Sequence, residues 1–92
     1  MAVAYIIDAV RTPRGVGKPG KGALSHLHPQ HLAATVLKAI KDRNNLDTST
    51  VDDIIWSTSS QNGKQGGDMG RMAALAAGYD ISASGTTLDR FC

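Results

Sequence analysis

Cys92 carries the most distinctive chemistry in this sequence, because it is the single cysteine among 92 residues. A lone thiol has no partner for a disulfide within the chain, so an oxidising compartment is not required. Free cysteines are more often inert core residues than nucleophiles. A nucleophilic thiol needs surroundings that stabilise the thiolate, such as a helix N-terminus beginning just after it, and an adjacent terminal carboxylate would disfavour that anion. Further observations are needed before Cys92 is taken as a nucleophile.

Two glycine patterns overlap in residues 15–22. The first fits G-x-G-x-x-G, in which the glycines turn a strand directly into a helix whose N-terminus receives pyrophosphate. Here Pro19 lies inside the motif and the next expected helix begins only at Pro29, so a dinucleotide site is not favoured. The second fits the start of G-x-x-x-x-G-K-[ST], but Gly22 stands where the hydroxyl that ligates Mg²⁺ should be. A mobile basic loop explains both patterns better.

Three histidines, His26, His28 and His31, lie close together in the sequence, and imidazole is a common zinc ligand. Two of them straddle an expected helix start, so their side chains are not expected to converge. No carboxylate lies nearby, and Cys92 is far away in the sequence. We therefore predict ordinary exposed histidines and no metal site.

The overall composition excludes several classes of protein. Ten Lys and Arg against eight Asp and Glu give a net charge of +2, which is too balanced for a dedicated nucleic-acid binder. No run approaches the roughly 20 apolar residues of a membrane span, and the N-terminus lacks the basic region of a signal peptide. We expect a cytoplasmic chain with no nucleic-acid partner and no membrane span. Its length allows one small domain at most and suggests part of a larger protein.

Two helices are expected to position these residues. Pro29 suits the first position of a helix that runs to about residue 44, with apolar residues recurring every four positions. Asn44 and Asn45 can end this helix, because Asn tolerates the left-handed conformation. Asp68 can cap a second, alanine-rich helix that is stopped by Gly78 and is suited to close packing.

Strands are expected around these helices. The runs Val3–Val10, Ile54–Ser59 and Gly85–Phe91 are rich in β-branched or apolar residues, and long glycine-containing loops separate them from the helices. The resulting order, strand–helix–strand–helix–strand, predicts an α/β fold with right-handed crossovers where strands are parallel. Cys92 would follow the third strand.

Several segments, in order, carry a likeness to a known family. They are Asp8–Gly15, Gly22–Leu24, Leu32–Ala34, Val51–Ile55, Gly70–Gly78 and Thr87–Cys92. Together they resemble the N-terminal part of a thiolase, the acetyl-CoA acetyltransferase and 3-ketoacyl-CoA thiolase family, over essentially all 92 residues. The V-R-T-P opening and the strand leading to Cys92 are the most specific parts.

The resemblance implies a thiolase-like fold of layered α-β-α-β-α type, of which residues 1–92 would be an incomplete part of the N-terminal domain. It implies that Cys92 is the acyl-accepting nucleophile, placed at a strand-to-helix turn. The family's second cysteine, catalytic histidines and coenzyme A loop domain would lie beyond position 92, so no cofactor-binding residue is assigned here. Many members have Asn where this chain has Asp89, which leaves the subfamily and substrate range open.

The implied activity is that of an acyltransferase in fatty-acid metabolism, with acyl-CoA and CoA as substrates and no permanently bound cofactor. A homodimer or homotetramer is implied as well. Two other functions stay open: a non-catalytic acyl-CoA or lipid-carrier relative with the same fold, and a phosphate- or nucleotide-binding module that uses the basic stretch 11–41. We also expect residues 1–92 not to be stable alone, because the alanine-rich helix would lack the layers that cover it.

Overall fold

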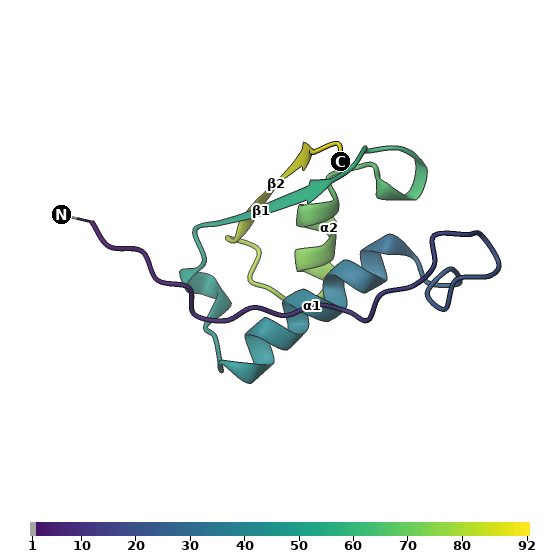
Figure 1. Ribbon diagram of the computed structural model, residues 1–92. Helices are drawn as coiled ribbons and strands as arrows, with labels where there is room; N and C mark the ends of the chain where they lie inside the picture. The colour runs from purple at the N-terminus through teal and green to yellow at the C-terminus, as the bar shows by residue number, and fades with distance from the viewer. Residues whose placement is uncertain (1) are drawn as a thin grey trace.

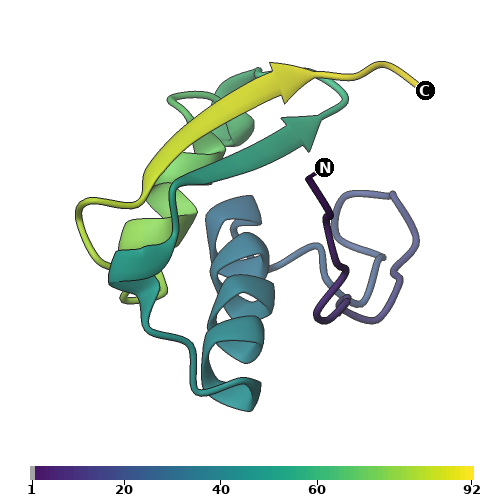
Figure 2. The same cartoon turned by 90° about the vertical axis from the view of Figure 1, so that its left-hand side faces the viewer.

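The computed structural model describes residues 2–92, in which one helix packs on one face of a small parallel sheet and a second helix packs against the first (Figure 1). The elements follow the order α1 (Pro29–Arg43), η1 (Thr48–Thr50), β1 (Asp53–Thr58), η2 (Gly63–Gln65), α2 (Met69–Ala76) and β2 (Ser84–Asp89). Figure 2 shows α2 behind the two strands and α1 below them, next to α2. The predicted α/β class is therefore confirmed.

Helix α1 begins and ends where the sequence predicts, because both ends are capped. Pro29 occupies the first turn, and the Nδ1 atom of His28 accepts the backbone N–H of Gln30 at 3.0 Å. The helix stops at Asn44, and Asn45 follows with a left-handed φ of 47°. His28 thus serves the start of a helix, a role that the sequence analysis did not assign to it.

Strands β1 and β2 pair in parallel, from Asp53 opposite Ser84 to Thr58 opposite Asp89. Successive side chains alternate between the two faces of a strand. Ile54 is buried against the helices, whereas Ile55 and Leu88 on the opposite face are 70% and 52% exposed. Within residues 2–92 β1 pairs with no strand other than β2, so this sheet is covered on one face only and both of its edges are open.

The core between helices and sheet is small, and most of its members are alanines. Its buried residues are Ala33, Leu37, Ile54, Met69, Ala73, Ala74, Ala77, Tyr79 and Ala83. The largest polar group among them is the Tyr79 hydroxyl, which donates a hydrogen bond of 2.8 Å to the carbonyl oxygen of Leu37 in α1. Burial raises the pKa of Tyr79, because the charged form loses its hydration.

The strand predicted over Val3–Val10 is not formed. Residues 2–10 run along the side of α1 that faces away from α2, without pairing to either strand (Figures 1 and 2). Asp8 holds this segment by accepting a hydrogen bond of 2.9 Å from Asn44 and by an ion pair of 3.4 Å with Arg43. The apolar side chains that led to the prediction remain exposed, for instance Ile6 at 92%. Residues 2–92 therefore contribute two strands to the sheet and not three.

Candidate active site

Cys92 lies just beyond the carboxyl end of β2, and its side chain is exposed. The backbone N–H of Arg90 donates to the carbonyl oxygen of Thr58 at 2.6 Å, which continues the β1–β2 pairing one residue past the end of β2. In open sheets of parallel strands, ligand sites form outside the carboxyl ends of the strands. The thiol thus lies at the carboxyl end of the strands, where ligand sites are expected.

The start of α2 lies directly against both strands because two glycines face each other there. A Cβ atom at Gly70 would be 2.9 Å from the Cβ atom of Trp56 and 3.1 Å from the carbonyl oxygen of Thr86. A Cβ atom at Gly85 would be 2.9 Å from the backbone nitrogen of Arg71. Real Cβ contacts are not this short, so a side chain at either position would push the helix away from the strands.

A hydrogen-bond network on the inner face of β2 joins that strand to the start of α2. The Oγ1 atom of Thr87 donates to the Asp68 carboxylate at 2.7 Å and accepts the backbone N–H of Gly70 at 2.9 Å. Asp68 also caps α2 by accepting the backbone N–H of Arg71 at 3.3 Å. Its own backbone is left-handed, with φ 58°. The predicted cap is confirmed, and it is shared with β2.

The loop between β1 and α2, residues 59–68, begins at the same carboxyl end of the strands. Its Gln61 side chain donates to the carbonyl oxygen of Thr87 at 3.3 Å. Inside the loop, the Gln65 side chain donates to the carbonyl oxygen of Ser60 at 2.8 Å. Thr87 therefore bonds the loop at two points, near its beginning through Gln61 and at its end through Asp68.

The opposite end of β2 is held by Arg71. Its Nη1 atom donates to the carbonyl oxygens of Ile81 at 3.1 Å and Ala83 at 3.0 Å, fixing the segment through which the chain enters the strand. Nearby, hydrogen bonds from the hydroxyl and the backbone N–H of Ser82 lower the pKa of Asp80. Both ends of β2 are thus tied by side-chain hydrogen bonds.

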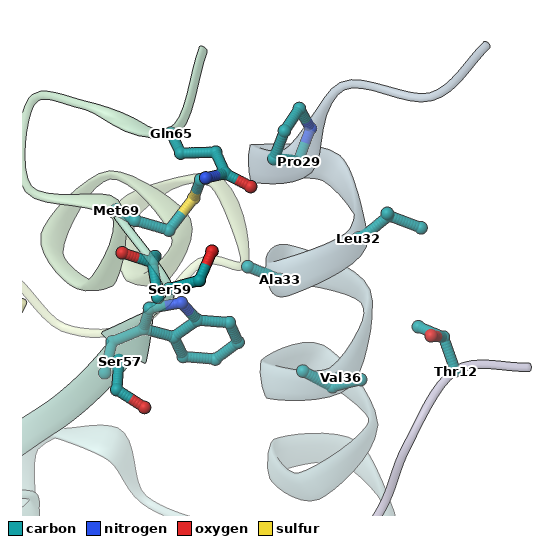
Figure 3. A pocket seen from close by; sticks show the side chains of 11 residues that line it. Thr12, Pro29, Leu32, Ala33, Val36, Ser57, Ser59, Gln65 and Met69 are labelled. Carbon is teal, nitrogen blue, oxygen red and sulfur yellow. The ribbon is translucent and has the colours of Figure 1, made fainter. Parts of the chain in front are cut away.

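A cleft of about 270 Å³ opens between α1 and the carboxyl end of β1 (Figure 3). Residues of α1, such as Ala33 and Val36, line one side, and Ser57 and Ser59 line the other. The Oγ1 atom of Thr58, which also lines the cleft, is the one buried side-chain oxygen or nitrogen of residues 2–92 without a hydrogen-bond partner. The lining of the cleft is largely apolar and includes hydroxyl groups of serine and threonine side chains.

The remaining sequence candidates do not converge on a site. Across residues 2–92, no group of three or more His, Cys, Asp or Glu side chains is placed to hold a metal ion. The glycine loop folds back on itself, because the backbone N–H groups of Lys21 and Gly22 both donate to the carbonyl oxygen of Lys18. Gly22 packs so closely on Val16 that a Cβ atom would lie 1.9 Å from its carbonyl oxygen. These glycines do not open a helix, which begins at Pro29.

Comparisons with known proteins agree on one family. The family model described as "Thiolase, N-terminal domain" matches residues 4–92. A steroid 3-ketoacyl-CoA thiolase of Mycobacterium tuberculosis is 45% identical over 92 residues, which are 100% of this chain and 22% of that protein. A 3-oxoadipyl-CoA/3-oxo-5,6-dehydrosuberyl-CoA thiolase of Escherichia coli is 42% identical over 93 residues, covering 100% of this chain and 22% of its own length.

A solved structure agrees with these relatives. The crystal structure of the Bacillus anthracis acetyl-CoA acetyltransferase matches with a TM-score of 0.60 and 31% identity, over 73% of this chain and 17% of that one. The chain thus spans about a fifth of the length of the proteins that it matches. No helix within residues 2–92 is long and apolar enough to cross a membrane.

Proposed function

Because this chain belongs to the thiolase family, we propose that it carries the nucleophile of a thiolase-type acyltransferase, with Cys92 as the residue that accepts the acyl group. The observation that supports this most is the position of Cys92, beyond the carboxyl end of β2 and inside the region that matches the N-terminal thiolase domain. The relatives' names point to 3-ketoacyl-CoA substrates.

The proposed reaction has two half-reactions. In the degradative direction, the Cys92 thiolate attacks the keto carbon of a 3-ketoacyl-CoA, and the bond from that carbon to the α-carbon of the thioester breaks. The acetyl-CoA enolate that leaves takes up a proton, while the shortened acyl group stays on Sγ. The thiolate of free CoA then attacks this thioester, forms the shortened acyl-CoA and restores Cys92. In the opposite direction, Cys92 takes acetyl from one acetyl-CoA and releases CoA. The enolate of a second acetyl-CoA then attacks the acetyl-cysteine, which forms acetoacetyl-CoA and releases the Cys92 thiolate.

Sulfur suits both half-reactions, because a thiolate is a strong nucleophile and also a good leaving group. The base that generates the thiolate and the enolate is assigned to the family's histidine and second cysteine, in the part of the relatives that this chain does not span. Donors aimed at the developing oxyanion would stabilise each tetrahedral intermediate. We include in the proposal a homodimeric or homotetrameric assembly in the cytoplasm, with CoA as substrate and not as a resident cofactor.

The test is acyl transfer to Cys92 in the full-length protein. Incubation with acetyl-CoA is expected to add one acetyl group per active site, on the peptide that contains Cys92, and mass spectrometry measures it. A Cys92→Ser variant should lose most turnover, because a serine hydroxyl is hardly ionised near neutral pH. Protein alkylated with iodoacetamide before incubation serves as the control that takes up no acetyl.

Four outcomes contradict the proposal in different ways. Near-normal thiolysis by the Cys92→Ser variant, or acetyl found only on another residue, removes Cys92 as the nucleophile. Binding of acyl-CoA without any transfer identifies a non-catalytic relative. Affinity for simple nucleotides that disappears in a Lys18→Ala, Lys21→Ala double variant identifies a phosphate-binding module instead.

A further inference from the structure

Thr87 connects three parts of the molecule that meet near the end of β2. Its hydroxyl bonds the capping residue Asp68 and the first turn of α2 at Gly70, with distances of 2.7 and 2.9 Å. Its carbonyl oxygen accepts the side chain of Gln61 from the loop 59–68. We propose that Thr87 is a positioning residue for Cys92, which it serves by fixing the loop 59–68 and the start of α2 against the strand that leads to the thiol.

The hydroxyl of Thr87 both donates and accepts a hydrogen bond, which gives the network a defined geometry. It uses its one hydrogen to donate to Asp68 and a lone pair to accept from Gly70. The bond to an ionised carboxylate is the stronger kind, because charge-assisted hydrogen bonds exceed neutral ones. Asp68 keeps a left-handed φ of 58°, which is unfavourable for a residue with a side chain and persists only where the surroundings determine it. The Asp68 carboxylate accepts hydrogen bonds from the Thr87 hydroxyl and from the backbone N–H of Arg71, and these two bonds hold Asp68 in this conformation.

Three hydrogen bonds join the segment 58–68, which is the last residue of β1 and the loop that follows it, to Thr87 and Arg90 at the end of β2. At its start, the carbonyl oxygen of Thr58 accepts the backbone N–H of Arg90. Further along, Gln61 reaches the carbonyl oxygen of Thr87, and at the end Asp68 reaches its hydroxyl. Two of the three bonds end on Thr87. Losing its hydroxyl would release the end of the loop while leaving the sheet register intact.

Cys92 lies five positions after Thr87 and two after Arg90. The bond of Arg90 to Thr58 continues the β1–β2 pairing up to the point where the loop 59–68 begins, so the chain leaves β2 beside the loop that Thr87 holds. A misplacement of about 1 Å at a reacting atom can lower a rate by about a hundredfold. This inference rests on the proposed role of Cys92 as nucleophile and adds the residue that orients it.

The experiment uses three variants of the full-length protein. Thr87→Val removes the hydroxyl and keeps the shape, Thr87→Ser restores the hydroxyl, and Thr86→Val is the matched control. Thr86 lies one position earlier on the exposed outer face, and its side chain makes none of the hydrogen bonds found within residues 2–92. For each variant we would measure the melting temperature, the rate of Cys92 alkylation by iodoacetamide in the native protein, and kcat and KM for acetyl-CoA.

We expect Thr87→Val to lower kcat and the rate of Cys92 acetylation by about tenfold or more, while KM changes by less than about threefold. The dependence of alkylation on pH should also shift relative to the parent protein. Thr87→Ser should restore the rates to within about threefold, and Thr86→Val should keep them. If Thr87→Val fails to fold, Gln61→Ala replaces it, since Gln61 is exposed and its loss removes only the bond to the carbonyl of Thr87.

The inference is overturned if Thr87→Val lowers only the melting temperature, with kcat and alkylation per folded molecule unchanged, or if Thr87→Ser does not restore them. It is equally overturned if Gln61→Ala, where it is the variant used, matches the parent protein. The proposed function fails separately, through a Cys92→Ser variant that retains thiolysis. A protein in which Cys92→Ser is inactive and Thr87→Val is fully active would keep the function and reject the positioning role.

Discussion

Replacing Gly85 by Ala tests how closely α2 must approach β2. The added Cβ atom would meet only backbone, with the nitrogen of Arg71 at 2.9 Å, its Cα atom at 3.1 Å and the carbonyl carbon of Gly70 at 3.2 Å. Backbone atoms cannot rotate away as the end of a long side chain can, so the helix and the strand must separate. The positions of Gly85 and Gly70 therefore require residues without a Cβ atom.

The size of the effect follows from opposing contributions. Overpacking of this kind costs about 1–3 kcal/mol. Replacing a glycine also reduces the conformational entropy of the unfolded chain, which favours folding by about 0.4–1 kcal/mol where the backbone allows it. For Gly85→Ala we expect a net loss of about 1–2 kcal/mol in the free energy of unfolding. For Gly70→Ala the loss should be smaller, because Ala is also the better helix former by up to about 1 kcal/mol.

The assay is urea unfolding of the full-length protein, with Gly17→Ala as the matched control. A Cβ atom at Gly17 would find nothing within 4 Å, so this substitution should leave stability within about 0.5 kcal/mol of the parent. Because β2 would be displaced, alkylation of Cys92 should change in Gly85→Ala and not in Gly17→Ala. Equal stabilities for the two variants would refute the close approach of α2 and β2.

Two further predictions concern the core and its coverage. Tyr79→Phe keeps the buried ring but loses the 2.8 Å bond to Leu37, so it should lower the free energy of unfolding by about 1 kcal/mol at neutral pH. Since burial raises the pKa of Tyr79, the stability that its neutral form gives is present below the ordinary pKa of 10.0 and is lost as pH rises through the higher pKa of the folded state. Urea unfolding near pH 11 should show this loss of stability in the parent protein and not in the Phe variant. The same alkaline loss in both proteins would contradict the prediction. Residues 1–92 expressed alone should melt without a sharp cooperative transition, because Ile55 and Leu88 lie uncovered on the outer face of the sheet; a sharp calorimetric peak would contradict this.

The sequence predicts the helices well because their signals are local. Pro29 and Asn45 mark the ends of α1, and Asp68 and Gly78 mark those of α2, within two residues of the structure. The segment 3–10 fails for a different reason. Its apolar, β-branched side chains favour extended backbone, but a strand also requires a partner edge, and here Asp8 is held by α1 instead.

The site is predictable only in part. Cys92 stands out as the single thiol, yet its proposed role comes from the family resemblance, since free cysteines are usually inert. Thr87 was not found, because its partners Asp68 and Gly70 lie 19 and 17 positions away, and such bonds leave no periodic signal in one sequence. The sequence places Gly70 in a helix and Gly85 in a strand, but it does not predict that these two glycines face each other.

The open sheet has a consequence for self-association. Exposed strand edges with apolar side chains are templates for pairing with a further chain, and they lead to aggregation when a unit folds before its neighbours. In β1 and β2 this hazard is greatest at Ile55 and Leu88. Asp53 at the first position of β1 and Asp89 at the last position of β2 each bring a negative charge to the ladder. Two copies that pair through the same strand edge in parallel register would bring these like charges together, which disfavours that mode of self-association.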